Sequence, residues 1–315
     1  MKYYIGIDLG GTNIKGALVS ENGEIVKQST CPTRAEQGVE AVTENIADMI
    51  RDLAKDATVD GVGLGCPGTV DDKAGTVIYA CNIGWVDYDV RTALKELTGY
   101  NVRLVNDANA AALAEVVAGA AKGAESAVVV TLGTGVGGGV VIGGKLLTGY
   151  TGAASELGHM VIVADGEDCA CGRKGCFEAY ASATALIRMT CEAMAKHPES
   201  AMHQIAAEQG VDGRTAFTSQ QMGDAAGDEV VKTYIHYLSI GIANIVNIFF
   251  PEVIALSGGV ANQGENLLVP LREKVGQQEY GAAYTVKHPC IVCCTLGNAT
   301  GMIGAAMFAK EGHGK

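Results

Sequence analysis

The chain repeats one glycine-rich plan, and this repeat constrains its fold more than any other feature. Residues 3–26 read as a strand, a turn at Gly10 and Gly11, a second strand, an Asn-Gly turn and a third strand. The same order recurs over residues 126–147, in SAVVVTLGTGVGGGVVIGGKLL. Two such units indicate a duplicated α/β fold with a cleft between its halves, in which glycines let the backbone approach a ligand closely.

Apolar residues at helical spacing predict further elements between and after these units. A helix is expected over residues 38–54, and a short strand, VRLVND, leads into an alanine-rich helix over residues 108–118. Other helices are expected over residues 90–98, 179–197 and 229–250, and a last one from about residue 298. Since no linker or low-complexity tract divides the chain, its 315 residues indicate one large or two medium domains.

The charge balance and the N-terminus exclude several classes of function. With 35 acidic against 23 basic residues the net charge is −12 and no basic stripe occurs, which argues against nucleic acid or an acidic membrane as a partner. The opening MKYYIGIDLG lacks the apolar core of a signal peptide, and no stretch reaches transmembrane length without a polar interruption. We therefore expect a cytoplasmic protein with small-molecule partners, whose 10 cysteines do not form a disulfide framework.

The first glycine turn carries residues suited to a phosphate group. Gly10 and Gly11 let backbone amides approach phosphate oxygens, while Thr12 and Lys15 supply a hydroxyl donor and a cation. Asp8, at the end of the preceding strand, is placed to hold Mg²⁺ directly or through water. An ordinary hairpin turn would have the same sequence, so this motif alone leaves both interpretations open.

A second glycine turn follows the equivalent strand of the repeat. Thr134 and Gly135 stand there, which favours two phosphate loops suited to a nucleotide polyphosphate. The run GTGVGGG contains the spacing G-x-G-x-x-G, but a strand follows it instead of a helix, which excludes a dinucleotide fingerprint. No GxxxxGK[ST] loop occurs either.

Asn106 and Asp107 end a short strand immediately before a helix. A carboxylate there can point into a cleft and accept the proton of an attacking hydroxyl, as a general base does in phosphoryl transfer. Asp and Asn are also favoured helix N-caps, and the pair by itself does not distinguish the two roles.

The most specific stretch lies between two glutamates, at residues 156 and 178. It contains a set of metal-ligand side chains: His159, Cys169, Cys171 and Cys176. Three thiolates and an imidazole suit a closed, structural zinc site that would order the loop between the glutamates. Three free cysteines with a solvated histidine are the alternative, and Cys191 or His197 is a lesser choice of fourth ligand.

Several motifs together cover essentially the whole chain: DLGGTNIKG, LGCPGTV, NDANAAALAE, TLGTGVGGG, ELGH, CACGRKGCFE and YASATAL. They resemble the bacterial ROK family (repressor, open reading frame, kinase), and within it most closely the glucokinases. The resemblance implies an α/β fold of the duplicated actin-like ATPase (ribonuclease H-like) type, with two domains around a cleft. The small N-terminal domain would comprise residues 1–117 and the C-terminal helix 298–315, and the large one residues 118–297 with the zinc-binding loop.

The resemblance further implies that the chain phosphorylates glucose to glucose 6-phosphate with ATP and Mg²⁺, and that Asp107 deprotonates the sugar hydroxyl. The sugar contacts that it implies are Asn82, Asn106, Asp107, Glu156, His159 and Glu178. It adds Gly258 and Gly259, under the adenosine, to the nucleotide contacts named above. It makes His159, Cys169, Cys171 and Cys176 the ligands of a structural Zn²⁺, and it implies a homodimer or homotetramer.

Some features keep other interpretations open. Ser155 stands where these kinases often have glycine, next to an implied sugar contact, so the exact sugar preference is open. Related kinases act on N-acetylmannosamine, N-acetylglucosamine, allose or fructose, or use polyphosphate. A ROK repressor would carry a helix-turn-helix before DLGGT, where seven residues precede Asp8. Trp85 is expected to pack beside Asn82 and not to stack on a sugar.

Overall fold

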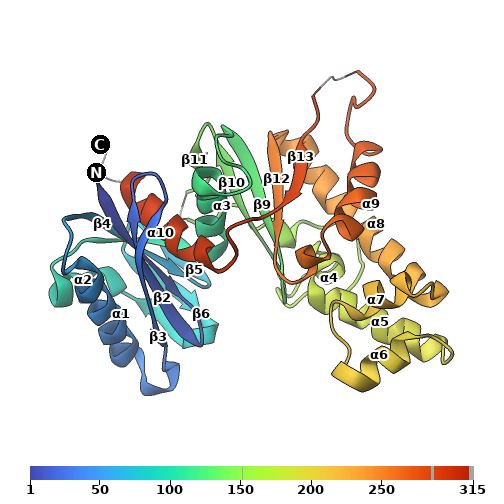
Figure 1. The fold of residues 1–315 in the computed structure, drawn as a ribbon, viewed down its shortest axis with the longest axis horizontal. Coiled ribbons are helices and arrows are strands. Elements are labelled where there is room, and N and C mark those ends of the chain that lie inside the picture. Colours follow the sequence, from blue (N-terminus) through green and yellow to red (C-terminus); the bar gives the residue numbers. More distant parts are fainter. Residues whose placement is uncertain (151, 285–286, 312–315) are drawn as a thin grey trace. The chain divides into compact units, whose positions relative to one another are not determined.

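The chain folds into two compact units (Figure 1). The computed structural model describes residues 1–150, 152–284 and 287–311. Unit 1 comprises Met1–Val129, Gly139–Ser155 and the residues from Cys294 onward, and unit 2 comprises Val130–Gly138 and Glu156–Cys293. The domain boundaries expected from the sequence stay a prediction, and residues 312–315 of the expected last helix lie outside the described residues.

Two five-stranded sheets share one strand order, which accounts for the repeat in the sequence. The orders are β3-β2-β1-β4-β8 and β11-β10-β9-β12-β13. The first sheet consists of β1 (Tyr3–Leu9), β2 (Asn13–Ser20), β3 (Ile25–Pro32), β4 (Val59–Cys66) and β8 (Val102–Asn106). The second consists of β9 (Ser126–Leu132), β10 (Val136–Ile142), β11 (Lys145–Leu146), β12 (Val253–Ser257) and β13 (Cys290–Cys293). The predicted duplicated α/β fold is confirmed.

The direction of the strands in unit 1 places three strand ends together. β1 pairs antiparallel with β2 through the first glycine turn, and parallel with β4, which in turn pairs parallel with β8. The carboxyl ends of β1, β4 and β8 therefore meet at one edge of the sheet. In open α/β sheets, ligands bind outside this edge.

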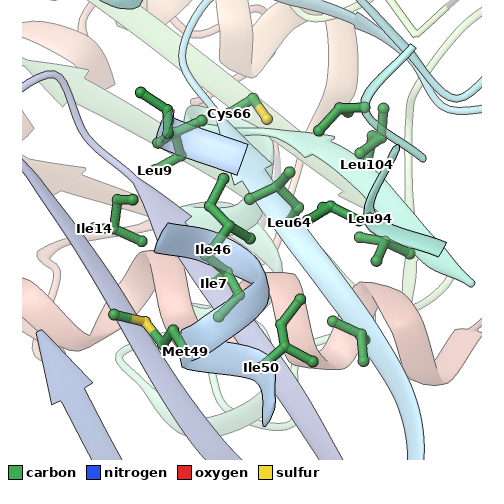
Figure 2. Close-up of a cluster of buried hydrophobic side chains, with 14 of the residues drawn as sticks. Ile7, Leu9, Ile14, Ile46, Met49, Ile50, Leu64, Cys66, Leu94 and Leu104 are labelled. Carbon is green, nitrogen blue, oxygen red and sulfur yellow. The ribbon is translucent and has the colours of Figure 1, made fainter. Parts of the chain in front are cut away.

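One face of this sheet is covered by α1 (Val39–Ala54) and α2 (Val90–Thr98). The apolar residues of α1 recur at helical spacing, as predicted, and form one face that packs onto the strands. Figure 2 shows this core, with side chains from α1, α2 and three of the strands pointing toward one another: Ile7, Leu9, Ile46, Ile50, Leu64, Leu94 and Leu104. Burial of such side chains contributes roughly 1.5–3 kcal/mol each.

The other face is covered by α3 (Asp107–Ala118) and the C-terminal α10 (Thr300–Glu311). A Cβ added at Gly6 of β1 would clash with the carbonyl of Met302, and one at Gly63 of β4 with the carbonyl of Ala305. These glycines therefore let the backbone of α10 lie directly on the strands. The last helix in the sequence thereby becomes part of the same unit as the first strand.

Helices form most of unit 2. They are α4 (Glu178–Ala181), α5 (Ala183–Lys196), α6 (Met202–Gln209), α7 (Thr215–Gln221), α8 (Ala225–Phe249) and α9 (Glu265–Gly276). The prediction of one helix over residues 179–197 is wrong, because Ser182 has an extended backbone and its hydroxyl accepts the N–H of Ala185 at 3.1 Å. Ser182 thus caps a new helix, as N-cap serines do.

A small sheet of unit 1, with the order β5-β6-β7, was not expected from the sequence. Its strands are β5 (Thr69–Asp71), β6 (Thr76–Ala80) and β7 (Trp85–Tyr88). Among the described residues, no helix combines the length and the apolar character needed to span a membrane.

Candidate active site and metal site

The strand ends of unit 1 bring two carboxylates to one edge of the sheet. Asp8 of β1 pairs in register with Gly65 of β4, and the next residue of β4, Cys66, pairs with Asn106 of β8. Asp107 follows as the first residue of α3. Burial raises the pKa of Cys66, and the charges of Asp107 and Asp8 raise it further, so both carboxylates lie near this thiol.

The turn between β1 and β2 is fixed by the end of β3. The N–H of Gly10 donates to the carbonyl of Asn13 at 3.0 Å, and a Cβ at Gly10 would lie only 2.8 Å from that oxygen. Thr33 holds the turn from the other side: its hydroxyl donates to the carbonyl of Gly10 at 2.6 Å, and its N–H to that of Thr12 at 2.9 Å. Gly11 and Thr12 are exposed, as an anion-binding turn requires.

Asp8 is packed closely at the base of this turn. Burial raises the pKa of its carboxyl group, the cation of Lys15 opposes this rise, and the charge of Asp107 adds to it. Lys15 is the direct partner of Asp8 across the two strands. A Cβ at Gly301, in the first turn of α10, would clash with the Asp8 carboxyl group, so a larger residue there would force this group to move.

Hydrogen bonds at the start of α3 identify its N-cap residue. The side-chain oxygen of Asn106 accepts the N–H groups of Ala108 at 3.0 Å and Asn109 at 3.3 Å, and its amide donates to the carbonyl of Gly68 at 2.9 Å. Asn106 is therefore the N-cap. Asp107, one residue further on, does not fill that role.

The side chain of Asp107 is exposed, yet its surroundings change its acidity. Desolvation raises the pKa of the carboxyl group, while the N–H of Ala108, which donates to it at 2.8 Å, opposes the rise. A carboxylate with a raised pKa is a stronger base, which suits proton abstraction from a hydroxyl.

Asn82 lies beside the glycine turn. It belongs to the 3₁₀ turn Cys81–Ile83, is exposed, and its Cβ would lie 3.4 Å from a Cβ placed on Gly11. Trp85, three residues on, is fully buried and packs edge-to-face on Tyr88 with ring centroids 4.9 Å apart. Trp85 is thus a core residue, in keeping with the packing role expected for it, and the expectation that it does not stack on a sugar stays a prediction.

The second glycine turn lies in unit 2 between β9 and β10. The N–H of Gly133 donates to the carbonyl of Gly135 at 3.0 Å, and Thr134 is exposed at the tip. Gly258, after β12, has a φ of 89° and lies so close to β9 that a Cβ would clash with the carbonyl of Leu132. Gly258 and Gly259 are therefore next to the strand that leads into the turn.

Four predicted metal ligands of unit 2 come together. The ligand atoms of His159, Cys169, Cys171 and Cys176 all lie within 4.8 Å of one another. The Sγ atoms of Cys171 and Cys176 are 3.7 Å apart, and Nδ1 of His159 is 3.8 Å from Sγ of Cys169. A tetrahedral ion with metal–sulfur bonds of about 2.3 Å has sulfur–sulfur edges of about 3.8 Å, so the donor set fits such an ion.

The cluster contains His159 as the fourth candidate ligand beside the three cysteines. Cys191 lies exposed on α5 and His197 pairs with Glu199 at 3.2 Å, and neither belongs to the cluster. Burial raises the pKa of Cys169 to about 12, whereas the N–H of Arg173 lowers the pKa of Cys171. A metal ion would displace protons from the thiols that still carry them.

Tight turns shape the metal-binding loop. The N–H of Cys169 donates to the carbonyl of Arg173 at 2.8 Å, and the N–H of Gly172 donates back to the carbonyl of Cys169 at 2.9 Å. Gly172 has a φ of 85° and Gly175 one of 76°, values that favour glycine. The spacing CACGRKGC thus encodes both the ligands and the turns between them.

The two glutamates have different surroundings. Glu156 is exposed and directly precedes the 3₁₀ turn Leu157–His159. Glu178, the first residue of α4, is partly buried, and its Oε2 accepts the N–H of Val136 at 2.9 Å. Ser155 has a φ of 69°, a left-handed conformation that glycine adopts without strain, and this explains why glycine suits the position.

Comparison with known proteins matches this arrangement to one family. The model of the ROK family matches residues 4–312. The chain belongs to the ROK family. It is 37% identical to a glucokinase of Halalkalibacterium halodurans, covering 98% of this chain and 96% of that one. It is 38% identical to a glucokinase of Thermotoga maritima, covering 98% and 97% of the two chains.

A solved ROK structure shares the fold and the family's actin-like architecture. The ROK glucokinase from Streptomyces griseus, in complex with glucose and AMPPNP, superposes with a TM-score of 0.79 at 33% identity, covering 98% of this chain and 99% of that one. The expected actin-like ATPase fold is confirmed for this ROK protein.

Sequence reasoning missed two residues that support the site. Thr33 and Gly301 are distant in sequence from DLGGT, and only the pairing of β2 with β3 and the docking of α10 bring them to it. A threonine at a strand end and a glycine at a helix start are common, so no local signal distinguishes them.

Proposed function

We propose that this ROK protein is an ATP-dependent glucokinase, which transfers the γ-phosphoryl group of ATP to the 6-hydroxyl of glucose. The observation that carries the proposal is the position of Asp107, at the same sheet edge as Asp8 and the first glycine turn. A base next to a phosphate-binding turn suits transfer of a phosphoryl group to a hydroxyl. The similarity to glucokinases over nearly the full chain supports glucose as the acceptor.

Asp107 accepts the proton of the attacking hydroxyl in this proposal. Asn106 contributes by capping α3, which holds the first turn of the helix and thus the backbone of its neighbour. The proposed sugar ligands are Asn82, Asn106, Asp107, Glu156, His159 and Glu178. Since both side-chain ends of Asn106 are already hydrogen-bonded, we expect it to act mainly through the position of Asp107.

The proposed nucleotide ligands are Asp8, Gly10, Gly11, Thr12, Lys15, Thr134, Gly135, Gly258 and Gly259. Asp8 would hold Mg²⁺, which neutralises phosphate charge during the transfer. The closeness of the Lys15 cation, which opposes the rise in the pKa of Asp8, favours the ionised carboxylate that a magnesium ligand needs.

The four-residue cluster of unit 2 would hold a structural zinc ion. Its ligands would be His159, Cys169, Cys171 and Cys176, and no open position would remain for catalysis. The ion would link residues on both sides of the loop and so fix His159 and the helix start at Glu178. A cytoplasmic enzyme that feeds glycolysis, assembled as a homodimer or homotetramer, completes the proposal.

The proposal is tested by a panel of acceptor sugars with ATP. We expect kcat/KM for glucose to exceed that for mannose, N-acetylmannosamine, N-acetylglucosamine and fructose, because a site that hydrogen-bonds hydroxyls discriminates by up to roughly 10⁴-fold against analogues that leave its polar groups unpaired. A higher kcat/KM for an acetylated sugar would refute the glucose assignment. Absence of ADP formation with every sugar would refute the kinase itself, and polyphosphate in place of ATP tests the donor.

A further inference from the structure

The glycine turn between β9 and β10 is attached to the segment that follows the metal cluster by three hydrogen bonds. The N–H of Val136 donates to Glu178 Oε2 at 2.9 Å. The N–H of Ala183 donates to the carbonyl of Gly133 at 2.8 Å, and the hydroxyl of Thr184 donates to the carbonyl of Thr134 at 2.8 Å. The partners are about fifty residues apart in sequence and all belong to unit 2.

One of these bonds uses a backbone group that a helix start leaves without a partner. Ser182 is the N-cap of α5, so Ala183 is its first residue, and the N–H groups of a first turn have no acceptor within the helix. The N–H of Ala183 instead donates to the carbonyl of Gly133. Thr184 then reaches the next carbonyl of the turn with its side chain, although this side chain is itself exposed.

Glu178 approaches the turn so closely that a side chain at the residue opposite would displace its carboxylate. A Cβ at Gly135 would overlap Oε2 of Glu178. Gly135 therefore serves the carboxylate contact as well as the turn. The same carboxylate is two residues after Cys176, and its other oxygen, Oε1, lies 3.8 Å from Sγ of Cys169.

The segment that connects the cluster to the turn, residues 176–184, is short and mostly helical. The N–H of Ala179 donates to the carbonyl of Cys176 at 3.0 Å, so α4 starts directly from a predicted metal ligand. Four residues of α4 and the cap Ser182 then lead to Ala183 and Thr184. One continuous segment, residues 176–184, therefore connects the cluster to the hydrogen bonds that hold the turn.

We propose that Glu178 and Thr184 position the β9–β10 turn for nucleotide phosphates, and that metal binding at the cluster orders this turn through residues 176–184. The part that concerns the nucleotide rests on the proposed kinase function. The part that concerns order in the turn does not.

The first experiment compares three variants by steady-state kinetics in the metal-loaded enzyme. Thr184→Val removes the hydroxyl but keeps the shape, and loss of one hydrogen bond predicts a KM for ATP that is about 3- to 10-fold higher, with the KM for glucose unchanged. Thr184→Ser keeps the hydroxyl and is expected to restore the KM for ATP to within about 2-fold. Thr190→Val is the matched control, since its hydroxyl bonds only the carbonyl of Leu186 one turn back in the same helix, at 2.7 Å.

The kinetic outcomes separate positioning from general destabilisation. An unchanged KM for ATP in Thr184→Val, an equal rise in Thr190→Val, or no recovery in Thr184→Ser would each overturn the positioning role. Calorimetry with AMPPNP measures the nucleotide affinity of each variant without turnover. It therefore distinguishes weaker nucleotide binding from an effect on kcat alone.

The second experiment measures hydrogen exchange and does not depend on activity. We expect the amides of residues 133–138 to exchange faster after the metal is removed by a chelator, to recover on addition of Zn²⁺, and to exchange faster in Thr184→Val with metal bound. Faster exchange confined to residues 157–177 would overturn the coupling. Unfolding of the whole metal-free chain would overturn a coupling specific to this turn, and the Thr184 variants in the loaded enzyme would then still test the positioning role. Should no sugar be phosphorylated, the exchange result still stands, so the two proposals fail separately.

Discussion

Asp107 and Asn106 are neighbours in sequence but differ in their roles at the start of α3. Asn106 uses its side-chain oxygen on two N–H groups of the helix, as a cap does. The carboxylate of Asp107 accepts the N–H of Ala108 at 2.8 Å, and desolvation raises its pKa. Asn106 is thus the cap of the helix, and Asp107 is the proposed base.

Asp107→Asn is expected to lower kcat by roughly 10²–10⁴-fold or more, because the amide cannot accept the proton of the attacking hydroxyl. The glucose dissociation constant should change little, since the amide keeps the shape of the side chain and Asn106 still caps the helix. Coupled ADP assays and calorimetry with glucose measure the two quantities. Near-normal turnover in the purified variant would remove Asp107 from the mechanism.

The raised pKa of Asp107 predicts how the rate depends on pH. The base works only when ionised, so kcat should fall as the pH falls through its pKa, and this limb should lie above the ordinary value of 3.8. The pKa of Asp8 is raised as well, by burial. The pH profile of the residual rate of Asp107→Asn is therefore the control. It should lack the limb that is due to Asp107 and keep any limb that is due to Asp8. A profile that is flat down to pH 4 would contradict the prediction.

At the scale of elements, the loop between the two glutamates has little regular secondary structure. Its described backbone consists of tight turns and two isolated bridges, Val161 with Cys176 and Asp168 with Lys174. In the proposed zinc-bound form, the ion would link His159 to the three cysteines and so constrain a segment that lacks regular secondary structure.

Cys176→Ala is expected to reduce bound zinc from about one per chain to a small fraction, and to weaken glucose binding by roughly 10- to 100-fold, because the segment that begins α4 loses its anchor. Elemental analysis and calorimetry with glucose measure both effects. Cys191→Ala is the control, since Cys191 is exposed and outside the cluster. Full zinc content in Cys176→Ala would exclude Cys176 as a ligand.

The contact of α10 with the first sheet leads to a prediction about stability. Gly63→Ala should lower the free energy of unfolding of unit 1 by about 3 kcal/mol or more, because the new Cβ would meet the backbone carbonyl of Ala305, which cannot rotate away. Gly276→Ala is the control, since a Cβ there meets nothing within 4 Å. Urea unfolding followed by circular dichroism compares them, and equal stabilities would contradict the docking of α10.

At the scale of the whole molecule, the repeated hairpin plan is the basis of two sheets with one strand order. The two copies differ in the helices that cover each sheet and in the segments inserted between its strands. The first sheet is covered by α1 and α2 on one face and by α3 and α10 on the other. Unit 2 instead carries the loop with the Cys/His cluster and a long helix, α8. The duplication explains why a glycine turn stands at the same place in both sheets.

Strong local periodicity and turn chemistry were enough to predict many elements. The expected helices at residues 38–54, 90–98 and 108–118 and the glycine turns match the structure within one residue or so. The Cys/His cluster was also predicted from spacing, because its ligands lie within one short loop. The break at Ser182 was missed, since a serine inside an apolar helical pattern gives no sign that the chain will use it as a cap.

The sequence by itself determined the repeated strand–turn–strand units, the Cys/His cluster and the place of Asp8 before a glycine turn, because each of these depends on neighbours in the chain. Tertiary structure alone decided which residues support them. Thr33 reaches Gly10 through β3, Gly301 reaches Asp8 through α10, and Thr184 reaches the β9–β10 turn through α5. These contacts join residues far apart in sequence, and they arise only where burial of apolar faces brings the elements together.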